Sequence, residues 1–327
     1  MDRTNMQVGL FSSAKNEGPF ILEWVAYHIL VGFDPILVFS NDSTDGTTEL
    51  LDALDRNGIL THVLQDLEPG QTPQHEAAGK AFQHPSLANA DWLMWLDSDE
   101  FLYCPRDGNQ VAGLIERCAQ HSEGVAVNWL IFGDGNQEKW EPDLVTQRFL
   151  KRAENDHALH RHFKTLFRKS DKIRGLGLHR PHLYPDFQDD GSQFVNAAGL
   201  PMHEHMYRSG QRRRHALGAA PGHLVSHDWA AIFHYPVKTR DSFELKRRRG
   251  QGTKPVDAPN RASRFRERYW TKYNQNSVAD DRMLAMGDRL QAKVDELLAM
   301  PDVQRAHETC IRKYAQALHA VANPPEL

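Results

Sequence analysis

The 327-residue sequence has no long hydrophobic run and little cysteine. Its best apolar stretch, FILEWVAYHILVGF, is short and is interrupted by a glutamate and a histidine, whereas a membrane span needs about 20 apolar residues. The three cysteines, Cys104, Cys118 and Cys310, are odd in number and have no metal-binding spacing, which favours a reducing compartment. The amino terminus lacks the basic-then-apolar order of a signal peptide. These absences predict a cytoplasmic protein.

No sign of charge dominates the chain as a whole, whose formal net charge is −4 at pH 7. Residues 1–110 contain 5 Lys or Arg and 17 Asp or Glu, whereas residues 151–327 contain 31 Lys or Arg and 20 Asp or Glu. Such a basic region either forms solvated helix faces or faces a phosphate-rich ligand or surface. It contains no recognisable nucleic-acid-binding module, so nucleic acid is not an expected partner.

Apolar segments of strand and helix character alternate over the first 130 residues. The pattern predicts strands at 7–13, 35–40, 59–64, 92–97 and 124–132, and helices at 18–32, 44–58, 71–84 and 109–121. This alternation is typical of an α/β fold with a mostly parallel sheet covered on both faces. Residues 133 to about 260 lack clear periods. Two apolar stripes after about residue 278 predict carboxyl-terminal helices that pack on the domain.

Carboxylates crowd the end of the fourth expected strand. In DWLMWLDSDEFLY (91–103), apolar residues run directly into Asp97, Asp99 and Glu100. Asp97 and Asp99 point the same way on extended backbone, with about 7 Å between their Cα atoms. Like charges at that separation repel by about 2.5 kcal/mol at an effective dielectric constant of about 20. Such oxygen ligands suit Mg²⁺ or Mn²⁺, and a divalent ion shared with a diphosphate would remove the repulsion.

Two other polar clusters, SAKNEG and SNDSTDGT, follow the first and second expected strands. Ligands of open α/β sheets collect at the carboxyl ends of the strands. The three clusters are therefore expected along one edge of the sheet, where they would form one binding site.

The chain resembles the family 2-type and family 92-type glycosyltransferases in several segments, which occur in the family's order: SSAKNEGPFILEWVAYHILVGFDPILVFSNDSTDGT, WLDSDEFL, NWLIFGDGN followed by RF, FKTLFRK, and FHYPVKTRDSFELKRRRG. The resemblance covers roughly residues 7–252. It implies the GT-A fold, a Rossmann-like and mostly parallel sheet flanked by helices. It also implies transfer of a sugar, most often a hexose, from a UDP-sugar to an acceptor hydroxyl, with Mn²⁺ or Mg²⁺ between the DxD motif and the diphosphate.

On this resemblance the chain divides into a GT-A domain and a helical extension. Residues 1–260 form the expected domain, in which 1–132 are the nucleotide-binding half and 133–260 the acceptor half. Residues 261–327 form the carboxyl-terminal extension.

The resemblance assigns the nucleotide to the loops after the first two strands. Lys15, Asn16 and Glu17 match the loop that lies along the base and ribose. Asn41 and Asp45 match the motif after the second strand, although a serine precedes Asn41 where family 2 members usually have Asp. Glu17 and Asp45 also suit the start of a helix, where carboxylates complement the helix dipole or accept its free N–H groups.

The resemblance assigns the metal and the diphosphate to later residues. Asp97 matches the position near the ribose or the metal, Asp99 the position that binds the metal directly, and His234 a late histidine that completes the metal shell. Three basic residues after it are expected to hold the diphosphate as negative charge develops on the leaving group: Lys238, Lys246 and Arg247. The alternative for this basic run is a solvated helix face or an anionic partner such as a phospholipid head group.

Four residues are candidates for the remaining roles. An inverting reaction, which the resemblance leads us to expect, needs a general base within about 3 Å of the acceptor hydroxyl. Asp143 and Glu204 are the candidates for this base. Lys164 either binds the diphosphate or an anionic partner. Trp129 either stacks on a sugar or belongs to the core.

The expected acceptor is a saccharide or a glycolipid, with a peripheral contact between the basic half and an anionic inner membrane face. A sugar nucleotidyltransferase is an alternative, but SSAKNEGPF lacks the glycine- and arginine-rich loop that would hold a triphosphate. A metal hydrolase using HEH (203–205) has no recognisable zinc spacing. A non-catalytic binder of anionic glycans would explain the basic half but not the DxD strand.

Overall fold

The computed structural model describes residues 6–106, 108–118, 122–184, 193–202 and 218–323. The main sheet consists of β1 (Val8–Ala14), β2 (Ile36–Ser40), β3 (Thr61–Leu64), β4 (Trp92–Trp95), β5 (Glu100–Tyr103), β6 (Gly124–Ile131), β8 (Phe163–Arg168), β11 (Phe194–Asn196) and β12 (Ala231–His234). Two small pairs lie outside it: β7 (Lys151–Arg152) with β13 (Val278–Ala279), and β9 (Ile173–Leu176) with β10 (Pro181–Leu183).

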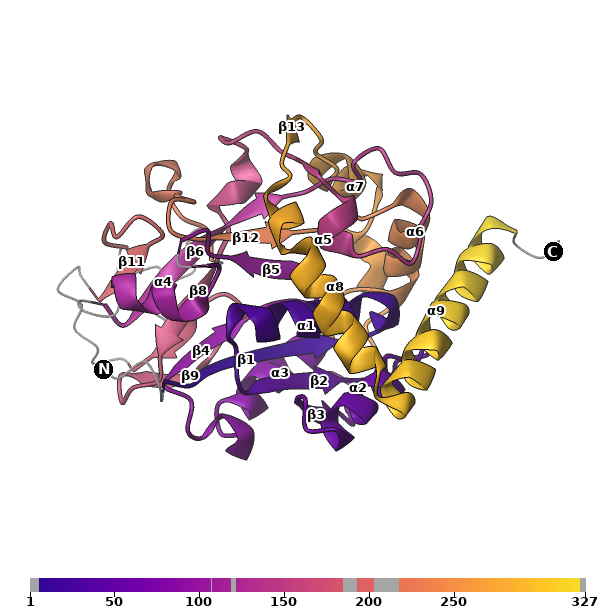
Figure 1. Cartoon of the computed structure of the whole chain (residues 1–327), viewed down its shortest axis with the longest axis horizontal. Helices are drawn as coiled ribbons and strands as arrows, with labels where there is room; N and C mark the ends of the chain where they lie inside the picture. Colours follow the sequence, from indigo (N-terminus) through magenta and orange to yellow (C-terminus); the bar gives the residue numbers. More distant parts are fainter. Residues whose placement is uncertain (1–5, 107, 119–121, 185–192, 203–217, 324–327) are drawn as a thin grey trace.

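Helices surround this sheet (Figure 1). They are α1 (Gly18–Val31), α2 (Thr47–Arg56), α3 (Pro73–Ala81), α4 (Val111–Cys118), α5 (Val145–Arg148), α6 (Arg240–Arg249), α7 (Glu267–Tyr273), α8 (Gly287–Leu298) and α9 (Pro301–Ala322). Short 3-10 helices lie at Pro85–Leu87, Ala158–Arg161, Gly222–Leu224, Arg261–Arg264 and Arg282–Met286.

The main sheet is mostly parallel, as the sequence predicts. Within the described residues its order is β3-β2-β1-β4-β8-β6-β12-β5, and β11 pairs with β6. The neighbours among β1 to β4 all run parallel, as do β6 and β12. β8 runs antiparallel between β4 and β6, and β5 runs antiparallel to β12 at the edge. The expected GT-A type of architecture, a sheet of this kind flanked by helices and followed by helical residues, is confirmed.

Four strands of the described main sheet, β5, β8, β11 and β12, were not predicted from the sequence. β5 follows β4 after a tight reversal of the chain. Residues 96 and 97, predicted as the end of one strand, therefore belong to the connection between two strands. β8 lies in the stretch that shows no clear period, yet it occupies the middle of the sheet. Its sequence, FKTLFR, places a lysine among buried residues, which hides the strand pattern.

Both faces of the sheet are covered, and the side chains of each strand divide between them. In β1, Val8 and Leu10 belong to the core on the α1 side, whereas Phe11 belongs to the core on the α3 side. Met94 and Trp95 of β4 divide in the same way. Because successive side chains on a strand point to opposite faces, a strand covered on both sides reads as the continuous apolar run seen in the sequence.

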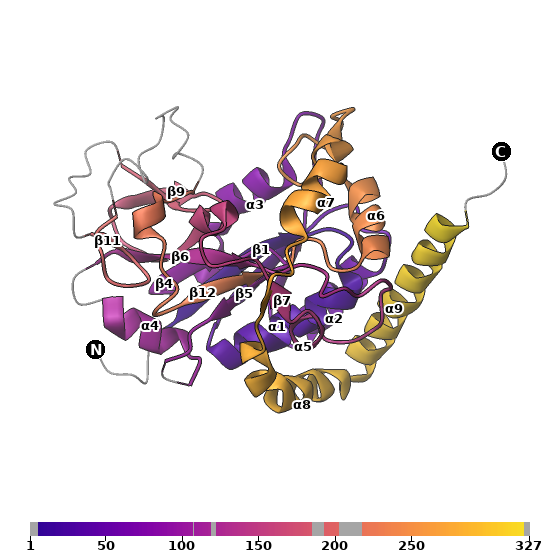
Figure 2. The same cartoon turned by 90° about the horizontal axis from the view of Figure 1, so that it is seen from above.

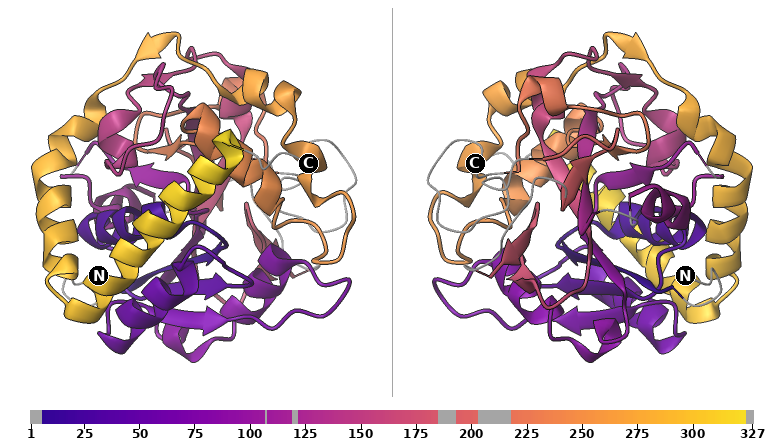
Figure 3. Two further views of the ribbon diagram at one scale, coloured as in Figure 1. Left: turned by 90° about the vertical axis from the view of Figure 1, so that its right-hand side faces the viewer. Right: turned by 90° about the vertical axis from the view of Figure 1, so that its left-hand side faces the viewer.

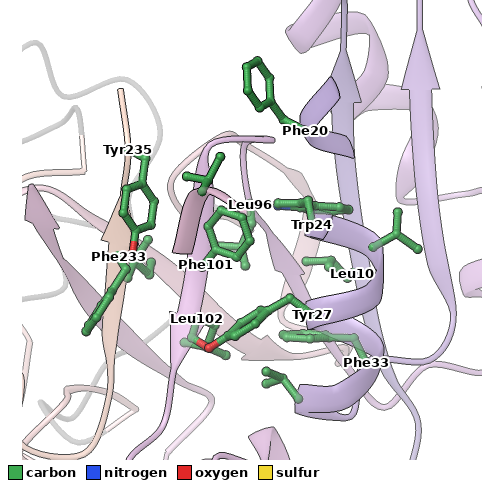
Figure 4. Packing of buried hydrophobic residues seen from close by; sticks show 14 of the residues in the cluster. Leu10, Phe20, Trp24, Tyr27, Phe33, Leu96, Phe101, Leu102, Phe233 and Tyr235 are labelled. Atoms are coloured by element: carbon green, nitrogen blue, oxygen red, sulfur yellow. The ribbon is translucent and has the colours of Figure 1, made fainter. Parts of the chain in front are cut away.

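Helix α1 is apolar on nearly all sides because the protein surrounds it. Its Trp24 and Tyr27 are fully buried and pack toward Phe101 and Leu102 of β5 (Figure 4). On the other side α8 and α9 pack against it. Gly32 ends the helix in the left-handed conformation, with φ 98°, which glycine adopts without a steric cost. None of the described helices has the length and apolar character that a membrane span requires.

The carboxyl-terminal helices pack on the domain, as the apolar stripes predict. α8 lies over α1 in Figure 1, and Leu290, Val294 and Leu297 are buried. α9 then runs past α2 and α6, crosses the molecule diagonally in Figure 3 (left) and ends at its outer side in Figure 2. Tyr314 of α9 is buried against Phe20 at the start of α1. The helices therefore extend the core of the sheet domain.

Candidate active site

One cleft opens at the carboxyl ends of β1, β2 and β4. The first half of the chain lines it with Lys15, Glu17, Asn41, Asp97 and Asp99. The second half adds residues that are distant in sequence: Trp129, His179, His234, Lys246, Arg249, Arg264 and Tyr269. The structure therefore brings the three polar clusters of the sequence together at one sheet edge.

The reversal between β4 and β5 places the acidic residues. Asp97, Ser98 and Asp99 form this reversal, and β5 then pairs with β12 so that Glu100 lies opposite His234. The backbone N–H of the residue after His234 donates to the Asp99 carbonyl over 2.9 Å. As a result, the Asp99 Oδ1 and His234 Nε2 atoms are 3.4 Å apart.

The carboxylate of Asp97 is engaged by the protein. Its Oδ1 accepts hydrogen bonds from the Trp95 indole at 2.8 Å and the Gln74 amide at 3.2 Å. Its Oδ2 forms an ion pair with the Lys164 ammonium at 3.0 Å. A carboxylate oxygen has two lone pairs, so Oδ1 has none left for a cation. Oδ2 keeps one lone pair and the residue lines the cleft, so Asp97 as a metal ligand stays a prediction, with fewer free positions than the sequence implies.

Lys164 is a buried counter-ion and not a surface ligand for an anion. Its side chain is 1% exposed and lies 3.0 Å from Asp97 Oδ2 and 3.3 Å from Glu100 Oε2. This corrects both sequence interpretations of Lys164, because the ammonium has no route to a diphosphate or a partner. It also corrects the argument that a metal must relieve the repulsion, since lysines pair with both aspartates.

Burial and these lysines set the protonation of the acidic turn. Burial alone would raise the pKa of each carboxyl, but the charge and hydrogen bond of Lys164, together with the hydrogen bond from Trp95, lower the pKa of Asp97. Against the same effect of burial, Lys246 and His234 hold the pKa of Asp99 well below its ordinary value. Glu100 is fully buried, and its pKa lies well above the ordinary value despite the nearby Lys164. Glu100 is therefore the carboxyl of the turn that retains a proton most readily.

Lys246 reaches the cleft from α6. Its ammonium donates to Asp99 Oδ2 and to the Pro236 carbonyl, each over 2.7 Å. Burial lowers the pKa of this lysine, although Asp99 opposes the shift. Burial likewise lowers the pKa of His234, so its imidazole is neutral near pH 7. Among the described residues, His234 Nδ1 has no hydrogen-bond partner.

Asp99 and His234 fit a divalent ion as two of its ligands. Two adjacent ligands of an octahedral ion lie about 3 Å apart, close to the 3.4 Å between Asp99 Oδ1 and His234 Nε2. A neutral imidazole is the form that ligates metals. No cluster of three or more His, Cys, Asp or Glu side chains in the described ranges could hold an ion. The remaining ligands would therefore have to be water or a bound phosphate.

The loop after β1 is tied to the loop after β2. Asn16 has a left-handed backbone, with φ 52°, and its Oδ1 accepts the Thr44 N–H over 2.8 Å. The Lys15 ammonium lies 3.2 Å from Asp42 Oδ2. Asn41 is buried and donates to the same carboxylate over 2.8 Å. These contacts hold Lys15 and Asn41 at the cleft, where the resemblance expects the nucleotide.

Asp45 has a structural position. Its Oδ2 accepts the N–H of Gly18 at 2.9 Å, and its Oδ1 accepts the N–H of Thr47 at 3.0 Å. Those residues begin α1 and α2, whose first N–H groups have no partner within the helix. Asp45 therefore joins the starts of both helices and does not line the cleft.

Arg249 is a cleft residue that the sequence interpretation missed, and Arg247 was the wrong choice from the same run. The Arg249 guanidinium pairs with Glu17 and donates to the Lys15 carbonyl over 2.9 Å. Burial would raise the pKa of Glu17, but Arg249, with smaller contributions from Lys238 and Lys246, lowers that pKa. Arg247 is exposed and lies 3.3 Å from Glu244 on its own helix, away from the cleft. Phe243 is buried, so the three-residue spacing from it through Lys246 to Arg249 was a usable signal.

Three other predicted residues lie elsewhere. Lys238 lines a neighbouring cavity and not the cleft. Asp143 is exposed, 3.9 Å from Arg148, in a separate surface hollow formed with α1 and α8. It is therefore not placed to act as a base in this cleft. Glu204 lies outside the described residues, and so does the HEH segment.

Trp129 both packs in the core and lines the cleft. Its ring centroid lies 4.4 Å from that of His234, 4.9 Å from that of His162 and 5.7 Å from that of His179. The Nδ1 atom of His179 lies 2.9 Å from the Phe163 carbonyl, to which it can only donate, so Nε2 is left unprotonated. Burial lowers the pKa of His179 to about 3. Neutral imidazoles therefore surround Trp129.

The chain matches the family model "Glycosyltransferase family 92" over residues 15–189, which is more than half of the sequence. A glycosyltransferase family 92 protein of Ricinus communis is 30% identical over 98 residues, and one of Oryza sativa subsp. japonica is 33% identical over 99 residues. Each match covers 29% of this chain and only 16% of the relative.

Solved structures with a similar chain course include S. aureus TarS 1–349, with 14% identity, a TM-score of 0.38, and coverage of 97% of this chain and 91% of that one. Another is a glucosyl-3-phosphoglycerate synthase from Mycobacterium tuberculosis in complex with Mg²⁺ and uridine diphosphate, with 17% identity and a TM-score of 0.27. The latter match covers 39% of this chain and 45% of that one.

Proposed function

The chain belongs to glycosyltransferase family 92, and from this premise we propose that it transfers a sugar from a UDP-sugar to an acceptor hydroxyl with the help of a divalent ion. One observation carries the proposal. The cleft combines an acidic turn beside a histidine with cations from α6, and a metal-bound diphosphate needs both kinds of partner. The carboxylate of Asp99 and the ammonium of Lys246 are 2.7 Å apart in this arrangement.

The cations would bind the diphosphate. Lys246 is fixed by Asp99 and the Pro236 carbonyl, and Arg249 is fixed by Glu17. Arg264 also lines the cleft. Donors held in place before reaction stabilise developing negative charge without reorganisation. Lys246 and Arg249 would therefore favour departure of the nucleoside diphosphate.

Asp99 and His234 would hold the ion. When bound, a divalent ion acts as a Lewis acid that stabilises negative charge on the leaving diphosphate. Asp97, whose carboxylate is engaged by Trp95, Gln74 and Lys164, would keep the turn in shape. This division of roles differs from the sequence prediction, in which both aspartates were ligands.

The acceptor side is less complete. We propose an inverting reaction by analogy with the family, which requires a base near the acceptor hydroxyl. Glu204 stays the predicted base, outside the described residues, since Asp143 lies in another hollow. The unprotonated Nε2 of His179, which also lines the cleft, offers a hydrogen-bond acceptor for a sugar hydroxyl.

We propose a saccharide or glycolipid acceptor and a cytoplasmic location at the inner membrane face. The basic second half of the chain supports this contact. Co-sedimentation with anionic vesicles, compared with neutral ones, tests it. Failure to sediment at every salt concentration contradicts the membrane contact and leaves the transfer reaction unaffected.

Calorimetric titration of UDP, with and without Mn²⁺, tests the donor site. We expect metal-dependent binding that Asp99→Asn weakens by about tenfold to a hundredfold, because a charge-assisted contact contributes about 1.5–3 kcal/mol. Asp295→Asn, an exposed carboxylate on α8, is the matched control and should bind normally. Thermal unfolding of each variant checks that it is folded.

If UDP does not bind under either condition, the same titration is repeated with GDP. If neither nucleotide binds, the proposed donor site is wrong. If UDP binds equally well without metal and to Asp99→Asn, the metal part of the proposal is wrong, while the nucleotide part stands. A screen of UDP-sugars for hydrolysis then identifies the sugar.

A further inference from the structure

A second cavity, of about 520 Å³, lies beside the cleft. The loop after β1, helix α6 and helix α9 form its walls. Lys15, Glu17, Lys246 and Arg249 line both the cleft and this cavity, so the Glu17–Arg249 ion pair belongs to the wall between them. We call this second cavity the α9 cavity. Lys238, which the sequence assigned to the diphosphate, lines the α9 cavity and not the cleft.

Lys238 is a largely buried residue whose ammonium forms no direct ion pair with a described carboxylate. The residue is 6% exposed, and its Nζ lies 4.3 Å from the centroid of the Phe20 ring. Within the described part of the chain it makes no hydrogen bond or ion pair. Its backbone is left-handed, with φ 53°, which side chains other than glycine rarely adopt. Because Lys238 lines the cavity, its ammonium is placed to bind an anion from outside the protein.

The other charges around the cavity also leave a positive surplus. Six cationic side chains and three carboxylates line it. Each carboxylate is engaged: Glu17 by Arg249, Asp42 by Lys15, and Asp45 by the N–H groups that begin α1 and α2. Lys246 and Lys313 pair with Asp99 and Glu49, which do not line the cavity. Arg248, like Lys238, forms no ion pair with a described residue. The cavity therefore favours an anion with more than one negative oxygen.

The remaining lining is apolar and firmly placed. Phe20, Leu245, Ala317 and Ala320 contribute carbon surface beside the cations. Helix α9 is close-packed where it meets α1 and α2: a Cβ atom at Gly18 would lie 2.8 Å from Cys310 Sγ, and one at Gly46 would lie 3.0 Å from it. The cavity is therefore built into the fold.

We propose that the α9 cavity binds a phosphate group, separately from the diphosphate of the donor. The cations would hold the phosphate oxygens, with Lys238 at the buried end, and the apolar residues would receive carbon atoms of the molecule that carries it. The phosphate could be free or could be the head group of a short-chain phospholipid. Most of the residues that line the cavity follow residue 189, where the family match ends, so this site goes beyond the proposed function.

Calorimetry with two probes tests the proposal on the full chain. Inorganic phosphate and dihexanoyl phosphatidate, the latter below its micelle concentration, are titrated with and without saturating UDP. We expect phosphate binding to persist with UDP present. Lys238→Met, which retains the stem over Phe20, and Arg248→Met should each weaken it by about tenfold, the effect of losing one charge-assisted hydrogen bond. Arg312→Met removes an exposed cation beside Lys313 that does not line the cavity, and it should have no effect.

The outcomes separate the two sources and the two sites. Phosphatidate that binds more tightly than phosphate identifies a lipid head group, whereas equal affinities identify a free phosphate. Displacement by UDP places the phosphate in the cleft and overturns the proposal. Unchanged binding in both Lys238→Met and Arg248→Met also overturns it, as does the absence of binding by either probe. Arg248 is exposed, so its variant stays informative if Lys238→Met fails to fold. If the protein does not bind UDP, phosphate binding by Lys238→Met and Arg248→Met still tests the proposal.

Discussion

The two halves of the chain contribute opposite charges around the β4–β5 reversal. The β4–β5 reversal supplies the carboxylates of Asp97, Asp99 and Glu100, whereas β8 and α6 supply the ammonium groups of Lys164 and Lys246. This matches the charge asymmetry of the sequence, which is acidic before residue 110 and basic after residue 151. The asymmetry therefore has a structural consequence, because the halves meet through these ion pairs.

The two ion pairs nevertheless differ in burial. Lys164 is 1% exposed and closed off, while the side chain of Lys246 is 14% exposed and lines the cleft. A closed pair acts on stability, because a buried charge that loses its partner is strongly unfavourable. A pair at the cleft can exchange its protein partner for a ligand. The comparison between a structural and a functional pair leads to the following predictions.

Removing Lys164 should have the largest effect. In Lys164→Met the Asp97 carboxylate loses its counter-ion and Glu100 its neighbouring ammonium. We expect the free energy of unfolding to fall by about 3–5 kcal/mol, the usual cost of breaking a buried ion pair. Urea denaturation measures it.

Lys172→Met is the matched control for Lys164→Met. Its ammonium pairs with Glu123 at 2.9 Å but is 42% exposed, and exposed pairs contribute about 0–1 kcal/mol. Equal losses in the two variants would contradict the structural role of Lys164 and the contrast between closed and open pairs.

The pH dependence of stability should show a second contrast between the halves. Each half holds a buried histidine in the same way: Nδ1 donates to a carbonyl, and Nε2 accepts a backbone N–H. In the first half His28 bonds Trp24 and Leu102, and in the second half His160 bonds Asn155 and Ile131. Burial lowers the pKa of His28 to about 3 and that of His160 to about 4.

A histidine whose pKa is lower in the folded state destabilises the protein as the pH falls. The unfolded chain takes up a proton below pH 6.5, the ordinary value, and the folded chain does not, so the free energy of unfolding drops by about 1.4 kcal/mol per pH unit for each group. For His28 the loss should continue to about pH 3, and for His160 to about pH 4.

His28→Gln and His160→Gln should each flatten this dependence, measured by urea denaturation between pH 7 and pH 4.5. His319→Gln, whose side chain is exposed, should retain the wild-type slope. If neither buried variant changes the slope, the two imidazoles are not held neutral by the fold. A change in one variant alone would show that the halves differ in how they hold a histidine.

The fold was predictable where contacts are local. The regular alternation up to residue 132 gave β1, β2, β3, β4 and β6 and the helices between them, because each apolar run has a definite length and a turn beside it. β5 and β8 could not be predicted in that way. Glu100 and Lys164 lie within these strands and look like surface residues, yet both are buried, because their side chains meet 3.3 Å apart in the folded chain. Such compensation across 64 positions leaves no pattern in either segment alone.

The candidate site was predictable where the motif is compact. Asp99 follows an apolar strand, and His234 ends another, so both could be found from their local sequence. Asp97 was harder to interpret, since its role depends on Trp95, Gln74 and Lys164. Lys238 was wrongly assigned to the diphosphate. Its closeness to His234 in the sequence does not determine which of the two adjoining cavities its side chain lines.

The smallest effect should distinguish two arginines of one run. Arg249 lines the cleft, whereas Arg247 is 51% exposed and pairs with Glu244. Two residues along a helix correspond to a rotation of about 200°, so the two side chains point to opposite sides. Arg249→Lys, which keeps a charge opposite Glu17, should weaken UDP binding by about tenfold, because lysine cannot reproduce the planar fork of arginine. Arg247→Lys should leave the affinity within about twofold, as expected for a surface pair. Calorimetry of the two variants measures both, and a larger loss in Arg247→Lys would mean that the cations of the second half meet the nucleotide on the other face of α6.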